Sequence, residues 1–333
     1  MLGLLGHIGA VVARARLGIG SALNIILHIG AHRTGTTSFQ NMLRATASDL
    51  RDCGIVVWEP KHTRDGRFAG LICPQTQFTP QTQSKAMKSL TGIQFELDRL
   101  DSAGVKTLLI SEENMLGQMR CNLAAHRLYP DARFRLGQFS RVFRQRVSRV
   151  VMAVRAQDAA WRSTLSYGLS AGLDLVAGTD FDALAASKRR WQHVVADAGR
   201  AFASAKLAVW QFEALLAAPN AQLAAALGAV PPVPARQLQA QHNRSPDARA
   251  LRMQATDRGL WRMAKMIPDE PAKWQPFTSA QRAAFQAAYA KDLNWLQAQS
   301  GHSLEFYDNE NGVCTQTNPD RGSFDDKRGQ RMG

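Results

Sequence analysis

Residues 24–50 limit the possible folds of this 333-residue chain more than any other segment. They begin with a short apolar run, NIILHIG (24–30), continue through a loop that ends at Gly35, and then show apolar residues at helical spacing. A short apolar run that ends in glycine is typical of a buried strand, and the spacing after it predicts an amphipathic helix to about residue 50. The backbone N–H groups at the start of such a helix favour an anion.

Apolar runs continue to alternate with helical patterns along the chain. We predict four further strands, at 54–60, 106–111, 149–154 and 206–212. The helical patterns lie at 87–101, 134–147, 157–172 and 182–204. Strands that are apolar on both faces and alternate with helices indicate a mostly parallel sheet covered on both sides. We therefore expect a three-layer α/β fold with helices on both faces and a helical C-terminal portion.

The two ends of the sequence differ in character from its middle. Residues 1–23 are mildly apolar, but Arg14 and Arg16 interrupt them, which argues against a signal peptide. Residues 306–333 are polar and glycine-rich and offer little to pack. We expect a poorly ordered N-terminal extension at 1–23, a single α/β domain at 24–305 and a disordered tail at 306–333.

The amino-acid composition indicates which classes of binding partner to expect. The chain has 41 Lys+Arg against 27 Asp+Glu, a net charge of +14 that favours anionic partners. Residues 120–162 alone hold ten arginines and no lysine, but no nucleic-acid-binding motif is present and aromatic residues are not interleaved with the cations, so nucleic acid is not expected. No apolar run has the length of a membrane span. Four scattered cysteines indicate neither a zinc site nor a disulfide framework and are consistent with a cytoplasmic location.

The first loop departs from the usual nucleotide-binding loop at its cation. Its glycines have the spacing of G-x-x-x-x-G-K-[ST], but Thr36 follows the second glycine, and the cation is Arg33, inside the loop. Thr36 cannot carry a charge to a γ-phosphate, which disfavours an ordinary ATPase or GTPase. A phosphotransferase or kinase with an unusual P-loop stays as an alternative.

The loop resembles that of a known enzyme superfamily. HIGAHRTGTTSFQ (28–40) is similar to the 5'-phosphosulfate-binding loop of sulfotransferases that use 3'-phosphoadenosine 5'-phosphosulfate (PAPS), especially the bacterial branch with H-I-G-x-x-K-T-G-T-T-S-x-Q. Arg33 stands where that family generally has lysine, so a planar guanidinium group replaces the compact ammonium group. The resemblance covers about residues 24–300. It implies that the cofactor is bound by His32, Arg33, Thr34, Gly35, Thr36, Thr37 and Ser38.

The same resemblance implies a fold and an activity. The fold would be P-loop nucleoside triphosphate hydrolase-like. The reaction would move a sulfuryl group from PAPS to a hydroxyl or amine of an acceptor, such as a glycan or a small metabolite. The other product would be 3',5'-adenosine bisphosphate, and no metal would be required. A catalytically inactive nucleotide-binding protein of the same fold is a second alternative.

A second motif resembles the 3'-phosphate site of that family, in which an arginine at a strand end is followed by a serine in the next helix. Here Arg155 ends the predicted strand 149–154, and Ser163 lies eight positions later. A dianionic phosphate is suited to a fork-shaped cation and a hydroxyl donor. A loop at 239–251 resembles one that closes over the cofactor in some members, which makes Asn243, Arg244 and Ser245 candidate contacts.

A third motif, Ser111-Glu112-Glu113, follows the predicted strand 106–111. It resembles the S-x-E or S-S-E of the bacterial branch, which makes Glu113 the expected catalytic base and Glu112 the alternate. The resemblance also implies that Arg33 stabilises the negative charge that develops on the bridging oxygen during the reaction. Carboxyl ends of parallel strands are where open α/β sheets bind ligands. His28 and His32 are rivals of Glu113 for the role of catalytic base. His28 lies inside an apolar strand and is expected to be a core residue, whereas His32 lies in the loop and is a candidate contact with substrate.

Overall fold

The computed structural model describes residues 23–172, 179–216, 218–229, 246–301 and 303–308. The predicted N-terminal extension, except for Leu23, therefore lies outside the described residues, as does the predicted tail beyond residue 308. The candidate contacts at 243–245 also lie outside them.

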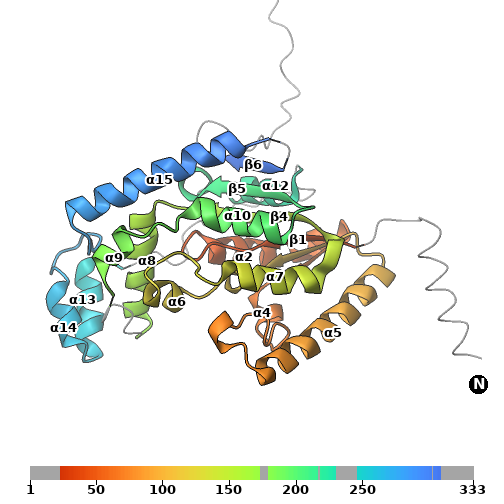
Figure 1. The fold of residues 1–333 in the computed structure, drawn as a ribbon, viewed down its shortest axis with the longest axis horizontal. Coiled ribbons are helices and arrows are strands. Elements are labelled where there is room, and N and C mark those ends of the chain that lie inside the picture. Colours follow the sequence, from red (N-terminus) through yellow and green to blue (C-terminus); the bar gives the residue numbers. More distant parts are fainter. Residues whose placement is uncertain (1–22, 173–178, 217, 230–245, 302, 309–333) are drawn as a thin grey trace, which may run out of the picture.

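A six-stranded sheet with strand order β2-β3-β1-β4-β5-β6 forms the centre of the molecule (Figure 1). Every pair of neighbouring strands is parallel. The strands are β1 (Asn24–His28), β2 (Ile55–Trp58), β3 (Thr107–Ser111), β4 (Val147–Val154), β5 (Lys206–Gln211) and β6 (Leu304–Tyr307). The prediction of a parallel sheet within an α/β fold is confirmed, and each of the five predicted strands is present.

The sixth strand was not predicted. β6 pairs in parallel with β5, with Leu304 opposite Leu207 and Phe306 opposite Val209. It contains only four residues and is separated from β5 in sequence by almost a hundred. A local sequence pattern cannot predict that two strands so far apart in sequence will pair. The predicted boundary of the tail at residue 306 is therefore wrong, because it falls inside β6.

The longer helices are α2 (Thr36–Ala45), α5 (Pro80–Ser102), α7 (Ala132–Phe143), α8 (Gln157–Ser170), α10 (Trp191–Ala201), α12 (Pro219–Leu227), α13 (Ala248–Asp257) and α15 (Ser279–Gln299). Those that begin at residues 36, 80, 132 and 157 follow patterns predicted from apolar spacing, with different ends. The pattern predicted at 182–204 is divided between α10 and a shorter helix at Phe181–Ala185, and α12, α13 and α15 were not among the predicted patterns. Shorter helices are α3 (Ala47–Asp52), α4 (Pro60–Thr63), α6 (Met119–Ala124), α9 (Phe181–Ala185), α11 (Phe212–Leu215) and α14 (Trp261–Met266). Single 3₁₀ turns are η1 (Gln75–Gln77), η2 (Glu113–Met115) and η3 (Arg144–Arg146).

Two predicted helices end earlier than their patterns suggested. The pattern to residue 50 divides between α2 and α3 at Thr46, whose hydroxyl donates to the carbonyl of Met42. The pattern to residue 147 ends at Phe143, because Arg144 adopts a positive φ of 52° that an α-helix cannot contain. Strand β4 then begins at Val147.

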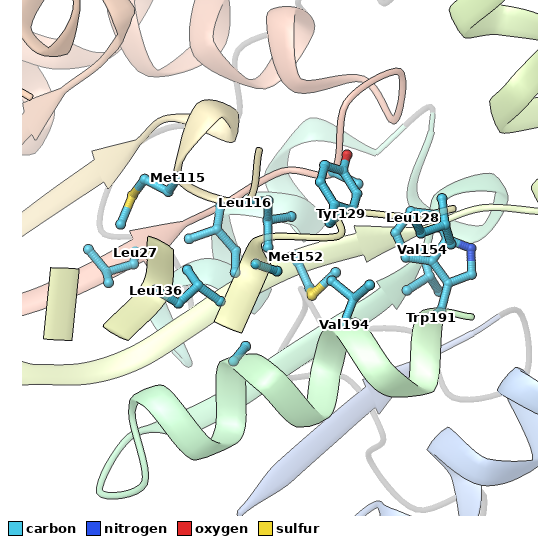
Figure 2. Packing of buried hydrophobic residues seen from close by; sticks show 14 of the residues in the cluster. Leu27, Met115, Leu116, Leu128, Tyr129, Leu136, Met152, Val154, Trp191 and Val194 are labelled. Carbon is cyan, nitrogen blue, oxygen red and sulfur yellow. The ribbon is translucent and has the colours of Figure 1, made fainter. Parts of the chain in front are cut away.

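Alternate residues of the strands enter two hydrophobic clusters. On one face, Leu27 of β1 belongs to the cluster of Leu136 (α7) and Val194 (α10), and Figure 2 shows these side chains gathered between the sheet and the two helices. On the other face, Ile26 belongs to the cluster of Phe39 (α2) and other residues of α2 and α12. The sheet is thus buried on both faces, as a parallel sheet requires. None of the described helices combines the length and apolarity needed to cross a bilayer.

The strand order shows at which edge of the sheet the direction of winding changes. The chain builds β2 and β3 on one side of β1 and then β4, β5 and β6 on the other. The direction of winding therefore reverses beside β1. In open α/β sheets ligands bind at the carboxyl ends of the strands where this reversal occurs.

Candidate functional site

Three of the sequence motifs lie together at this edge because β1 lies between β3 and β4. His28, the last residue of β1, is in register with Ser111 of β3 and Val151 of β4. The loop after β1 therefore lies between the Glu112–Glu113 pair that follows β3 and Arg155, which follows β4. The sheet brings together residues that are more than a hundred positions apart in sequence.

The loop between β1 and α2 is shaped by its two glycines. Gly30 has a φ of +112°, and a Cβ at this position would lie 3.0 Å from the Cβ of Glu113. Gly35 has a φ of +78° and lies against the ring of Phe212, 3.3 Å from where its Cβ would be. Glycine is the residue that tolerates both a positive φ and such close approaches. The Thr34 hydroxyl closes the loop by donating to the carbonyl of Ala31 at 2.7 Å.

The N-terminus of α2 has unused hydrogen-bond donors. Gly35 is the N-cap and supplies no side-chain acceptor, and the first turn contains no acidic residue. In the described part of the chain, no hydrogen bond is made by the backbone N–H groups of Thr36, Thr37 and Ser38. These donors, together with the positive end of the helix dipole, form a site for an anion.

Three predicted ligands from two separate motifs meet beside this helix. The Nε of Arg33 donates to the Oγ of Ser163 at 3.0 Å, and Nη1 of Arg155 donates to the carbonyl of Arg33 at 2.8 Å. Arg33 also has a positive φ of 62°, and its guanidinium lies 4.9 Å from the ring centre of Tyr167. The residues expected at the 5'- and 3'-ends of a nucleotide are thus in direct contact.

Two partly buried guanidinium groups lie close to one another in this cluster. Burial lowers the pKa of Arg33, and the nearby charge of Arg155 lowers it further. Burial also lowers the pKa of Arg155, against the opposing effect of Glu213. The Nε of Arg155 is buried without a hydrogen-bond acceptor among the described residues, and the Glu213 carboxylate is 3.5 Å away. A bound anion would relieve both the repulsion and the unmet donor.

Glu113 presents a partly buried carboxylate next to the loop. Its Oε1 forms an ion pair with Nη2 of Arg64 at 2.7 Å, and its Oε2 accepts from Nε2 of Gln40 at 3.0 Å. Burial acts to raise the pKa of Glu113, but His32 and Arg64 oppose it and hold the pKa below its usual value. The side chain is therefore ionised at neutral pH.

Glu112 has different surroundings, although it is the neighbour of Glu113 in sequence. It is fully buried and accepts from the hydroxyl of Thr63 at 2.5 Å and from Nε of Arg64 at 3.0 Å. It also accepts from the backbone N–H of Asn114 and so caps η2. These contacts anchor the loop between β3 and α6 to α4. Of the two predicted bases, the geometry therefore favours Glu113.

The two histidines also occupy different positions. His28 is buried, as predicted, with its Nδ1 2.8 Å from the Ser111 hydroxyl, and burial lowers its pKa to about 4. His32 donates its backbone N–H to the Tyr129 hydroxyl, and its ring Nδ1 is 3.1 Å from the same oxygen. The hydroxyl can give its single hydrogen to Nδ1, which leaves the imidazole proton on Nε2. Burial lowers the pKa of His32 below its usual value, so the ring is neutral at neutral pH.

Sequence reasoning missed two residues that hold Glu113. Gln40 lies within the loop motif, but only the structure shows that its amide reaches both Glu113 and the Ser111 hydroxyl, at 3.0 and 3.3 Å. Arg64 lies in a segment without periodicity, just after α4. A single arginine in such a segment gives no signal of its own, because its role depends on the placement of β3.

In comparisons with family models, curated proteins and solved structures, nothing matches this chain significantly.

Proposed function

We propose that the protein transfers a sulfuryl group from PAPS to a hydroxyl or amine of an acceptor molecule. The observation that carries this proposal is the meeting of Arg33, Arg155 and Ser163 beside the uncapped N-terminus of α2. Such a cluster offers two cations, a hydroxyl and several backbone donors to one ligand. A nucleotide with anionic groups at both its 5'- and 3'-positions matches that set of donors.

The N-terminus of α2 would hold the 5'-phosphate. The N–H groups of Thr36, Thr37 and Ser38 are unused among the described residues, and the hydroxyls of Thr37 and Ser38 are at least partly accessible. Backbone donors at a helix N-terminus bind phosphate without a lysine. The absence of a cation directly after Gly35 is thus compatible with a 5'-phosphate, whereas a γ-phosphate would lack its usual partner.

Arg155 and Ser163 would hold the 3'-phosphate. The Nε of Arg155 is buried, and among the described residues its nearest carboxylate is that of Glu213, in an ion pair at 3.5 Å without a hydrogen bond. The Ser163 hydroxyl lies next to the Arg33 guanidinium, 3.0 Å from its Nε, and this proposal assigns it to an oxygen of the 3'-phosphate. Nucleotides without a 3'-phosphate would lose both interactions. This is the basis on which the site would reject ATP.

The chemistry would proceed by in-line displacement at sulfur. The acceptor oxygen or nitrogen forms a bond to sulfur while the bond from sulfur to the bridging oxygen breaks, and the bonding electron pair leaves with the 5'-phosphate. Arg33 would stabilise the charge that develops on that oxygen. A phosphate is a weak base and needs no proton as it leaves.

Glu113 would accept the proton that the acceptor loses. Arg64 contacts one carboxylate oxygen of Glu113 and Gln40 contacts the other, so each oxygen keeps a lone pair that can accept the proton. A base placed in this way contributes about 10²–10⁴ to the rate. Its lowered pKa keeps it ionised, and the acceptor proton is lost only as the new bond to sulfur forms.

The proposal is tested by measuring the affinity of 3',5'-adenosine bisphosphate for the wild-type protein and for Arg155→Ala. Loss of charge-assisted hydrogen bonds to a phosphate should weaken binding by about 10–100-fold. Arg99→Ala, which removes an exposed arginine of α5 that pairs with Glu96, is the matched control and should bind normally. Equal affinity of wild type and a folded Arg155→Ala variant would contradict the proposed site.

A further inference from the structure

Exposed apolar side chains are present on α13 and α14, two helices that pack against each other. Seven large hydrophobic residues are exposed among the described residues, and three of them, Met253, Trp261 and Met266, fall on these two helices. Trp261 is 62% exposed, which is unusual for tryptophan. The two helices pack together at one end of the molecule, far from α5 (Figure 1).

The outer face of α14 combines apolar and cationic residues. At about 100° per residue, positions 261, 262, 265 and 266 cover one side of the helix and positions 263, 264 and 267 the other. Met263, Ala264 and Ile267 are buried, whereas Trp261, Arg262, Lys265 and Met266 are exposed. Around the exposed side the order is Trp261, Lys265, Arg262 and Met266, so the two cations lie between the two apolar residues.

The charge of this region is moderately positive. The segment 247–273 contains six cations, Arg249, Arg252, Arg258, Arg262, Lys265 and Lys273, and four acids, Asp247, Asp257, Asp269 and Glu270. Arg249 is paired with Asp269, and Arg258 donates to the carbonyl of Leu169 on α8. Within the described residues, no carboxylate pairs with Arg262 or Lys265. Both charges are therefore available to an anionic surface.

We infer that α13 and α14 bind an anionic lipid bilayer in its interfacial plane. We call the exposed residues Met253, Trp261, Arg262, Lys265 and Met266 the docking face. An amphipathic Trp and two Met can enter the boundary between headgroups and acyl chains while neighbouring cations contact lipid phosphates. A dry protein interface would suit these residues less well, because its core is depleted in charge.

The docking face is connected to the proposed site through α8. α13 packs against α8, which carries Ser163, and Arg258 joins the end of α13 to the same helix. Binding of the docking face to a bilayer would fix the orientation of α8 relative to the lipid surface. This inference does not depend on the proposed reaction, because bilayer binding is measured without nucleotide or acceptor.

The first experiment is co-sedimentation of the full chain with lipid vesicles. We expect binding to vesicles of phosphatidylcholine mixed with phosphatidylglycerol, weak binding to phosphatidylcholine alone, and loss of binding at high salt. The double variant Arg262→Gln/Lys265→Gln should reduce partitioning about tenfold or more. The matched control Lys85→Gln/Lys88→Gln removes the same charge from exposed positions on α5 and should change it less than about twofold.

The second experiment reports whether the docking face itself contacts lipid. Of the seven tryptophans, Trp261 is exposed, Trp295 is half-buried and the others are buried. Vesicles that contain brominated lipid should therefore quench the emission of Trp261, and Trp261→Phe should lose most of this quenching while still binding. Absence of vesicle binding would overturn the inference and would leave the docking face as a surface for a protein partner. Binding without quenching of Trp261 would also overturn it, because a different surface of the protein would then contact the lipid.

Discussion

Glu112 and Glu113 carry the same functional group at consecutive positions, but their contacts suit them to different roles. Glu112 is surrounded by donors from Thr63, Arg64 and the backbone of Asn114. Glu113 contacts Gly30 of the loop and is 15% exposed, so an acceptor could reach it. The difference arises because residues that leave the end of a strand alternate in direction.

Paired substitutions should separate these roles. Glu113→Gln keeps the shape and removes the base, so it should lower kcat by about 10²–10⁴ and leave nucleotide affinity within about twofold. Glu112→Gln weakens a buried, charge-assisted contact, so it should lower the free energy of unfolding by about 1–3 kcal/mol. Steady-state kinetics and urea unfolding measure the two effects. A Glu113→Gln enzyme with normal turnover would eliminate Glu113 as the base.

The pH dependence of kcat/KM offers an independent check on Glu113. Its pKa lies below the ordinary value of 4.5, so the base becomes protonated, and activity falls, only as the pH drops below that value. Arg64→Gln removes a neighbouring cation and should move the acid limb to higher pH by about one unit. If the acid limb of the kcat/KM profile stays at the same pH in this variant, a group other than Glu113 titrates there.

Only part of the site follows from its residues in sequence. The loop motif and the pairing of Arg155 with Ser163 were visible because each is a local pattern next to a strand. Arg64 and Gln40 were not assigned to Glu113, since their contacts to it cross 49 and 73 positions and depend on how α4 and α2 lie beside β3. Whether the assembled residues perform the expected roles stays a prediction.

Among the elements, β1, β3 and β4 carry the site, and β6 at the sheet edge carries an ion pair. Arg149 of β4 is 7% exposed and bonds to Glu305 and Tyr307 of β6 and to the carbonyl of Ala225 on α12. This cluster lies at the start of β4, whereas the site lies at its end. The ion-pair cluster and the candidate site thus lie at opposite ends of one strand.

The Glu305 contact should make stability depend on pH. Burial acts to raise the pKa of Glu305, but hydrogen bonds from Arg149 and Tyr307 and nearby cations lower it to about 2, from 4.5 for a free carboxyl. A lowered pKa stabilises the fold above the unfolded-state value, and the contribution disappears as the pH falls towards 2. Glu305→Gln should therefore reduce the free energy of unfolding by about 1–2 kcal/mol at neutral pH and by progressively less in acid.

Urea unfolding at a series of pH values measures this effect. Glu96→Gln is a suitable control, because it removes an exposed carboxylate that pairs with Arg99 within α5 and should change stability by less than about 0.5 kcal/mol. A constant difference between wild type and Glu305→Gln across the pH range would contradict the assigned ion pair.

Element prediction succeeded where the signal was local. Strands β1 to β5 are short apolar runs of the kind that a sheet covered on both faces requires, and their positions were visible in sequence. β6 was not visible, because its four residues alternate in burial at a sheet edge. The early end of α7 depends on the backbone of Arg144, a residue type that gives no warning of a positive φ.

At the scale of the whole molecule, the strand order explains why the separate motifs form one site. A chain wound outward on both sides of β1 places three loops at a single edge, and each loop contributes a different group. The alternation of strands and helices predicted the parallel sheet, but it left the order of the strands open. Without that order, Glu113 and Arg155 could not be placed on either side of the loop.

Nucleotide preference tests whether this edge of the sheet binds a 3'-phosphorylated nucleotide. Thermal shift or calorimetry should compare 3',5'-adenosine bisphosphate with adenosine 5'-monophosphate and with ATP plus magnesium. We expect the bisphosphate to bind at least about tenfold more tightly than either nucleotide that lacks the 3'-phosphate. Equal binding of the two adenosine phosphates, or preference for ATP plus magnesium, would contradict it.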